Sequence, residues 1–243
     1  MRVAVLSDVH GNRHAFEAVL EDVASADVAE TWCLGDVVGY GADPGDCVDL
    51  AREHCAVTLA GNHDLAVTGE LSLDDFSRGA ALAARWTADV LSQLHLSWLE
   101  GLSPAGERAG AGLYHGSPRD PVWEYVVSAL LAELCFDAAP ERVLLVGHSH
   151  VALSFTRREG DAATGERRYG GDEADLSQGR WLVNPGSVGQ PRDGDPRAAW
   201  LLLDLETRRA TWRRVRYDVD GAAKAIRAAR LPDSLAERLE YGQ

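Results

Sequence analysis

Five short polar segments, each placed directly after an apolar run, constrain this chain more than any other feature of its sequence. The first apolar run, Val3 to Leu6, is short and rich in valine, as buried strands are. Residues 1–150 repeat the same order of apolar run, polar segment and amphipathic stretch, which is typical of strands alternating with helices. The five polar segments are Asp8-Val9-His10, Gly35-Asp36, Gly61-Asn62-His63-Asp64, His115-Gly116 and Gly147-His148-Ser149-His150.

The spacing of apolar residues predicts the strands and helices between these segments. Over residues 1–150 it predicts strands at 3–6, 31–34, 56–59, 113–114 and 143–146, and helical regions at 15–23, 43–51, 73–101 and 122–137. After residue 150 it predicts strands at 152–156, 181–184, 199–205 and 210–217, with a loop or irregular hairpin at 159–179. The tail at 219–241 is predicted to form one or two short helices, broken at Pro232.

The order of these elements predicts the fold class. Strands that alternate with helices and are then followed by more strands indicate an α/β domain with two packed sheets. A chain of 243 residues has room for one large domain or two small ones. Because neither a linker nor an internal repeat interrupts the pattern, we expect a single domain over residues 1–243.

The polar segments are expected to meet in space although they are far apart in the sequence. Each lies at the carboxyl end of a predicted strand, and in open parallel sheets the loops at those ends form the ligand-binding crevice. Five of the eight histidines of the chain fall within the segments. The residues brought together in this way are Asp8, His10, Asp36, Asn62, His63, His115, His148 and His150.

Carboxylates and imidazoles together are the ligands of borderline divalent metals such as Mn, Fe and Zn. A single octahedral site cannot use seven candidate ligands and still leave room for a substrate, whereas two sites that share one carboxylate can. Asp36 is the natural bridge, because Gly35 and Gly39 near it allow a close approach of the backbone. Two ions about 3.5–4 Å apart activate water and neutralise a phosphoryl group during displacement. The sequence therefore predicts a dimetal site.

These segments, in this order, resemble the calcineurin-like metallophosphoesterases, and the resemblance covers residues 3 to about 205. A later block, Asn184-Pro185-Gly186-Ser187-Val188, is similar to the small bacterial phosphodiesterase branch of that family. The resemblance implies a four-layer α/β/β/α sandwich of two mixed sheets flanked by helices. It places the dimetal centre at the ends of the strands.

The resemblance also implies a role for each site residue. One ion would be held by Asp8, His10, Asp36 and His150, and the other by Asp36, Asn62, His115 and His148. Hydroxide bridging the ions would attack phosphorus in line, while Asn62 and His63 stabilise the developing charge. His63 would protonate the leaving group, and Asp64 would orient His63. The ions are expected to be divalent, with Mn favoured and Fe, Zn, Ni or Co as alternatives.

The substrate is expected to be a small phosphoester, with diesters favoured over monoesters. Protein Ser/Thr phosphatases of this family carry an Arg in a G-D-x-V-D-R-G pattern, and the run Gly35 to Gly41 has none. The phosphodiesterase branch often has Cys where this chain has His63, so a nucleotide or phosphoprotein phosphatase remains the alternative. A non-catalytic metal-binding scaffold is disfavoured, since every implied ligand is present.

Other polar residues are weighed as phosphate contacts. Asn12, at the start of the first predicted helix, and Arg119, after His115-Gly116, are the candidates. For Arg192 the favoured interpretation is a solvated loop charge, and for Tyr40 it is loop packing.

Charge and composition exclude several classes of protein. There are 24 Lys and Arg against 38 Asp and Glu, and a net charge of −14 argues against a nucleic-acid polymer or an anionic membrane as partner. No apolar run approaches the roughly 18 residues of a membrane span, and no signal-peptide pattern precedes Ser7. Four cysteines without C-x-x-C spacing predict reduced thiols. We therefore expect a cytoplasmic protein, and its oligomeric state is open.

Overall fold

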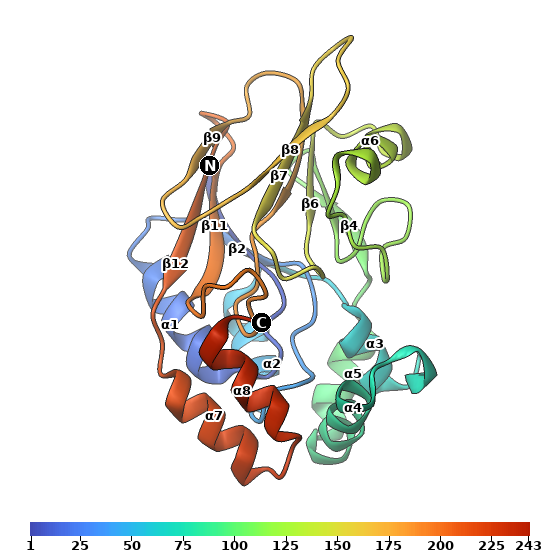
Figure 1. Cartoon of the computed structure of the whole chain (residues 1–243), viewed down its shortest axis with the longest axis vertical. Coiled ribbons are helices and arrows are strands. Elements are labelled where there is room, and N and C mark those ends of the chain that lie inside the picture. Colours follow the sequence, from blue (N-terminus) through green and yellow to red (C-terminus); the bar gives the residue numbers. More distant parts are fainter.

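Two six-stranded mixed sheets face each other, and helices cover their outer surfaces (Figure 1). The computed structural model describes residues 1–243. The first sheet consists of β3 (Val57–Thr58), β2 (Glu30–Cys33), β1 (Arg2–Leu6), β11 (Ala198–Asp204), β12 (Arg209–Val215) and β9 (Glu173–Asp175), in that order. The second consists of β4 (Ala105–Arg108), β5 (Ala111–Tyr114), β6 (Val143–Val146), β10 (Arg180–Asn184), β7 (Leu153–Arg157) and β8 (Thr164–Arg167). The predicted fold class is confirmed.

Each sheet combines parallel and antiparallel strands: the parallel strands form one side of the first sheet and the centre of the second. In the first sheet β1, β2 and β3 run parallel, and in the second β5, β6 and β10 do. The strand β11 pairs antiparallel with β1, in the register Val3 to Leu203. Because parallel strands end at the same edge, the loops after them gather at one end of each sheet.

The helices lie on the outer faces of the sheets and around the ends of the parallel strands (Figure 1). They are α1 (Arg13–Ala24), α2 (Pro44–His54), α3 (Asn62–Thr68), η1 (Leu73–Asp75), α4 (Arg78–Val90), α5 (Gln93–Glu100), α6 (Ala129–Ala138), α7 (Val219–Ala228) and α8 (Asp233–Tyr241). None of them is both long enough and apolar enough to cross a bilayer.

The two-residue alternation of β1 builds two hydrophobic cores at once. Val3 and Val5 belong to the core between the sheets, which also contains Trp212 of β12. Ala4 and Leu6 point to the other face and belong to the core that β1 shares with α1 and α2. Because successive strand side chains alternate between faces, one short apolar strand joins the helical layer to the inter-sheet core. A third core, which includes Phe136 of α6, covers the outer face of the second sheet.

The structure corrects two of the expected elements and adds a strand. The helical region predicted at 73–101 is interrupted twice, because Ser77 and Ser92 accept hydrogen bonds from the amides of Ala80 and His95 and begin new helices there. The helix predicted at 122–137 starts only after its N-cap residue Ser128. The strand β4 was not predicted at all.

The segment 159–179, predicted as a loop or irregular hairpin, contributes a strand to each sheet. Its first strand, β8, forms a hairpin with β7, and its second, β9, pairs with β12 of the other sheet. The break in the tail is confirmed, since residues 229–232, which end at Pro232, separate α7 from α8. All four cysteines are free thiols, as predicted.

Candidate metal centre

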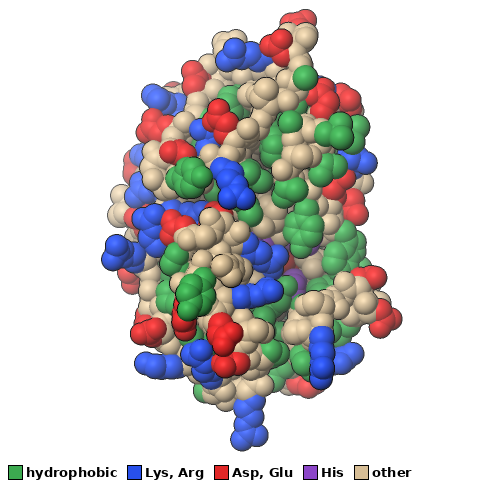
Figure 2. All heavy atoms as spheres, viewed as in Figure 1, with side chains coloured by type: hydrophobic (Ala, Val, Ile, Leu, Met, Phe, Trp, Pro, Cys, Tyr) green, Lys and Arg blue, Asp and Glu red, His purple; other side chains and the backbone are tan.

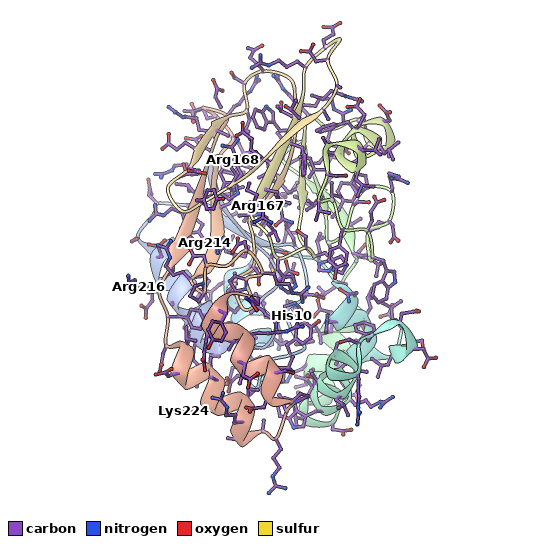
Figure 3. All side chains as sticks on the ribbon, viewed as in Figure 1. His10, Arg167, Arg168, Arg214, Arg216 and Lys224 are labelled. Atoms are coloured by element: carbon purple, nitrogen blue, oxygen red, sulfur yellow. The ribbon has the colours of Figure 1, made fainter.

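The loops after the parallel strands of both sheets meet at one place, where His10 lies near the middle of the molecule (Figure 3). The first sheet supplies Asp8, His10 and Asp36, and Asn62 follows as the first residue of α3. The second sheet supplies the other three candidate ligands, His115, His148 and His150. All seven are buried. The predicted convergence of these residues is therefore present in the structure.

Left-handed backbone conformations mark this site. Ten residues other than glycine have positive φ, and six of them are clustered here: Asp8, His10, Asp36, Tyr40, His148 and His150. Such conformations cost energy in L-residues and persist where the surrounding structure enforces them. The sharp turns they make are the local reason why ligands two positions apart, as in Asp8-Val9-His10, face the same centre.

One group of potential ligands consists of Asp8, His10, Asp36 and His150. The Nε2 atoms of His10 and His150 are 3.1 Å apart, and His150 Nε2 lies 3.3 Å from Asp8 Oδ1. Asp8 Oδ1 is buried and has no hydrogen-bond partner. A buried carboxylate oxygen without a donor, beside two imidazole nitrogens, fits a cation site.

A second group consists of Asp36, His115 and His148. His115 Nε2 lies 3.1 Å from His148 Nδ1 and 3.1 Å from Asn62 Oδ1. Asp36 joins the two groups through one atom, because Asp36 Oδ2 is 3.4 Å from His10 Nε2 and 3.5 Å from His115 Nε2. Its other oxygen, Oδ1, accepts a hydrogen bond from the backbone amide of His63 at 2.8 Å. The geometry thus suits two cations that share Asp36.

Backbone carbonyls fix three of the histidine rings. The Nδ1 atoms of His10, His115 and His150 lie 3.1, 2.9 and 2.6 Å from the carbonyl oxygens of Val38, Leu34 and Gln190. Nδ1 therefore donates the hydrogen bond and Nε2 keeps its lone pair, which points into the site. This arrangement is typical of metal-binding histidines. The carbonyl contacts hold the rings in this orientation without a metal.

Burial dominates the electrostatics of the site. It raises the pKa of Asp8 to about 7, and it raises the pKa of Asp36 well above its usual range, with Asp64 adding to the rise. It lowers the pKa of His63 to about 3 and that of His148 to about 2. Neutral imidazoles are ready to act as ligands, and bound cations would hold the two carboxyls in their ionised, ligating form.

The block Asn184 to Val188 positions the ligands. Asn184 Nδ2 donates to the carbonyl oxygen of Gly147 at 2.7 Å, beside His148. Ser187 Oγ donates to the carbonyl oxygen of Asp8 at 2.8 Å, and the Val188 amide donates to that of Ser7. These bonds connect the loop before β11 with the ligand loops after β1 and β6.

His63 lies beside the ligands, and its ring contacts His10 and Tyr40 at centroid distances of 4.9 and 4.3 Å. The direct contact expected between Asp64 and the His63 ring is absent. The Asp64 carboxylate instead accepts hydrogen bonds from the amides of Val37, Val38 and Gly61, at 2.8 to 3.3 Å. Asp64 therefore fastens the loop after β2 to the start of α3, the helix that carries His63.

Neither predicted outer phosphate contact faces the ligands. The Asn12 side chain caps α1 by accepting from the Ala15 amide, and it donates to the carbonyl oxygen of Gly189. Arg119 forms an ion pair with Glu124 at 3.0 Å, and its side chain is 38% exposed. Neither residue lines the cavity beside the ligands.

A cavity of about 330 Å³ opens onto the ligands, a size typical of small-molecule sites. Figure 2 shows histidine in a hollow at the centre of this face, with Lys or Arg side chains next to it. Several residues in its lining were not predicted as site residues from motifs, because they lie outside the polar segments, among them Phe76, Trp123, Tyr125 and Arg238. Tyr40 and Arg192, interpreted from sequence as packing and solvated residues, also line it.

A larger cavity of about 870 Å³ lies at the tip of β7 and carries no comparable chemistry. No candidate ligand lines it. Arg157 there is paired with Glu133 and Asp137, and Arg180 donates to backbone carbonyls. The smaller cavity is therefore the functional candidate.

Known proteins resemble this chain over its whole length. Residues 1–208 match the calcineurin-like phosphoesterase superfamily domain. The uncharacterized protein MJ0912 of Methanocaldococcus jannaschii is 37% identical over 246 residues, which cover 99% of this chain and 98% of the relative. The crystal structure of a metallophosphoesterase from Sphaerobacter thermophilus has a TM-score of 0.89 and 41% identity, covering 100% of this chain and 99% of the other.

A more distant structure shows the same fold. The hypothetical protein PH1004 of Pyrococcus horikoshii has a TM-score of 0.80 and 20% identity, with coverage of 100% of this chain and 98% of that one. Together with the seven buried ligand candidates, the match over residues 1–208 leads to one conclusion. This chain belongs to the calcineurin-like phosphoesterase superfamily.

Proposed function

We propose that this protein is a two-metal phosphodiesterase that acts on small phosphodiesters. The observation that carries the proposal is the position of Asp36 Oδ2, within 3.5 Å of histidine nitrogens from both ligand groups. Two divalent ions, when bound, would activate water and neutralise charge on the phosphate oxygens. Asp8, His10, Asp36 and His150 would hold one ion, and Asp36, Asn62, His115 and His148 the other.

The remaining chemistry belongs to residues beside the ligands. His63 lines the cavity and is buried against Tyr40 and Phe76, so water has little access to its ring. A ring nitrogen there can give its proton to the oxygen that leaves the phosphorus. Burial favours the neutral ring, and the negative charge of a bound phosphate opposes this by favouring protonation.

The cavity wall supports a diester as substrate. Phe76 packs edge-on against both His63 and Trp123, with centroid distances of 5.1 and 5.2 Å. Tyr125 stacks on His148 at 4.0 Å with an interplanar angle of 10°. These rings line the cavity outward from His63 and His148. They give the second organic group of a diester a surface on which to pack. A monoester has no such group.

A monoesterase is the second candidate, and one observation favours it. Arg192 lines the cavity and provides a cation where the Gly35 to Gly41 run has none. An additional guanidinium suits the extra charge of a terminal phosphate.

The deciding experiment compares turnover of bis-p-nitrophenyl phosphate and p-nitrophenyl phosphate by the Mn²⁺-loaded protein. Our proposal requires a diester-to-monoester ratio of kcat/KM well above one. A ratio below one would instead support a phosphatase. No turnover of either ester by protein that contains two ions would support a binding scaffold.

A further inference from the structure

We propose that Arg192, held by Tyr40, is the side chain that binds a non-bridging oxygen of the substrate phosphate. This inference rests on the proposed function, because it concerns the same cavity. It assigns to a loop just before β11 the anion-binding task for which the sequence suggested Arg119. Three features support it: the attachment of the Arg192 backbone, the contacts of its guanidinium and the conformation of Tyr40.

The backbone of Arg192 is attached directly to a candidate metal ligand. Its amide donates to the carbonyl oxygen of His150 at 3.1 Å. Two residues earlier, the carbonyl oxygen of Gln190 accepts from His150 Nδ1 at 2.6 Å. The next residue, Asp193, forms a buried ion pair with Arg214 of β12. Arg192 is thus fixed on both sides, so its distance from the ligands does not depend on a mobile loop.

The guanidinium of Arg192 has no acidic partner. It takes part in none of the ion pairs of the structure, whereas Arg119 is paired with Glu124 and Arg214 with Asp193. Its Nη2 donates to two neutral groups, Gln190 Oε1 at 3.0 Å and the Tyr40 hydroxyl at 3.4 Å. Its Nε is buried without a hydrogen-bond partner. A partly buried guanidinium with unused donors, in the lining of a cavity, is suited to bind an oxyanion.

Tyr40 connects this guanidinium to the reacting groups. Its ring lies 4.6 Å from His10 and 4.3 Å from His63 between centroids, and the Arg192 guanidinium carbon lies 5.8 Å from its ring centre. Tyr40 has φ of +59°, which a bulky side chain rarely adopts. The need for an aromatic ring between His10, His63 and Arg192 explains this strain.

These contacts place a cation close to His63 and on the cavity wall. An oxyanion between the ligands and Arg192 would receive charge-assisted hydrogen bonds from the guanidinium in a largely dehydrated site. Arg192 therefore binds the phosphate from a different part of the chain than the Arg of the G-D-x-V-D-R-G pattern.

The test uses inorganic phosphate as the probe and calorimetric titration of the Mn²⁺-loaded protein. We expect R192Q to weaken phosphate binding by about 10- to 100-fold, the usual loss for a hydrogen bond to a charged group. R192K is expected to fall between wild type and R192Q. The matched control is R119Q, which removes an arginine whose charge is already paired and is expected to change binding by less than about twofold.

Metal content and chemical rescue separate binding from a structural role. A further variant, R192A, leaves space for a guanidinium ion. Wild type and all four variants should contain two Mn²⁺ per chain, and guanidinium chloride should restore part of the lost kcat/KM of R192A but not alter that of R119Q. Phosphate affinity of R192Q within twofold of wild type, or no phosphate binding by wild type at millimolar concentration, would overturn the inference. Arg192-dependent phosphate binding by a protein that hydrolyses neither ester would uphold it and refute the proposed function.

Discussion

At the scale of single residues, the position of Asp36 tolerates substitution least, because one carboxylate oxygen faces both ligand groups. We expect Asp36→Asn to reduce Mn²⁺ content from two ions per chain to one or none and to abolish hydrolysis. The amide that replaces the carboxylate carries no negative charge and cannot bridge two cations in the same way. Elemental analysis of dialysed protein measures the change.

The control for this variant is Asp49→Asn, since Asp49 is exposed and lies outside the site. It should keep both ions and the wild-type rate. Two tightly bound ions in Asp36→Asn would disprove the bridging role.

Substitution of His63 is expected to have a different effect from that of Asp36, because His63 lies beside the candidate ligands and is not part of either ligand group. We expect His63→Ala to keep two ions and to lose about 10²- to 10⁴-fold in kcat, the usual contribution of an acid–base group. The loss should be smaller for p-nitrophenyl esters than for phenyl esters, since nitrophenolate leaves without a proton. An equal loss for both leaving groups would argue against proton donation by His63.

At the scale of elements, glycines in the ligand loops keep space for functional side chains. Gly39 has φ of +89°, and a Cβ built on it would lie 2.5 Å from His63 Nδ1. We expect Gly39→Ala to destabilise the protein by more than the roughly 1 kcal/mol of a strained alanine and to lower kcat through displacement of His63. Urea unfolding and steady-state kinetics test both effects.

Gly69 is the matched control for this substitution. It has φ of +86°, almost the same as Gly39, but a Cβ there would meet no atom within 4 Å. Gly69→Ala should show the cost of the backbone conformation alone and leave kcat unchanged. Equal effects of the two substitutions would show that the contact with His63 is unimportant.

The loop that carries Arg192 is fastened to β12 by the ion pair between Arg214 and Asp193, whose side chains are 3% and 9% exposed. We expect Arg214→Met to lower the free energy of unfolding by about 3–5 kcal/mol, because it leaves a buried carboxylate without its partner. The neighbouring pair Arg197 and Asp195 is more exposed, so Arg197→Met should cost less than about 1 kcal/mol. Denaturant titration distinguishes these values, and similar losses would show that burial of the first pair has no effect.

At the scale of the whole molecule, the candidate metal centre joins the two sheets. The His148 amide, after β6, donates to Asp8 Oδ2, after β1, at 3.1 Å, and His115 Nδ1 donates to the carbonyl oxygen of Leu34 at 2.9 Å. Four ligand candidates come from the first sheet and its loops, and three from the second. Bound ions would therefore hold both halves of the sandwich together.

Removal of the ions should accordingly destabilise the whole fold. Saturation of one site at 100 times its Kd adds about 2.7 kcal/mol, which corresponds to a rise in Tm of about 5–10 °C for a chain of this size. We expect EDTA to lower Tm by at least this amount, and Mn²⁺ to restore it. Asp36→Asn should respond far less to Mn²⁺, and an identical response would mean that the ions bind elsewhere.

The single domain expected over residues 1–243 stays a prediction. It is supported by the inter-sheet core, to which Val5 of β1 and Leu145 of β6 both contribute. Because that core cannot form from either sheet alone, we expect one cooperative unfolding transition.

The sequence by itself determined the candidate ligands and much of the sandwich. Strand patterns and the polar segments after them are local features, and the rule that parallel strands end at one edge is enough to bring Asp8 and Asp36 together at one sheet and His115 and His148 together at the other. Local patterns were less reliable where a single serine decided the outcome, as Ser77 and Ser92 did by ending and restarting helices.

The tertiary structure alone decided which side chains surround those ligands. Arg192 and Tyr40 are 152 positions apart in sequence, and their contact exists only because the loop before β11 packs beside the loop after β2. The pairing of Arg119 with Glu124, and that of Asp64 with three backbone amides, were likewise not predicted from the sequence. Apolar periodicity records which face of an element is buried, but it holds no information about which distant loop lies opposite, and that depends on how the two sheets pack.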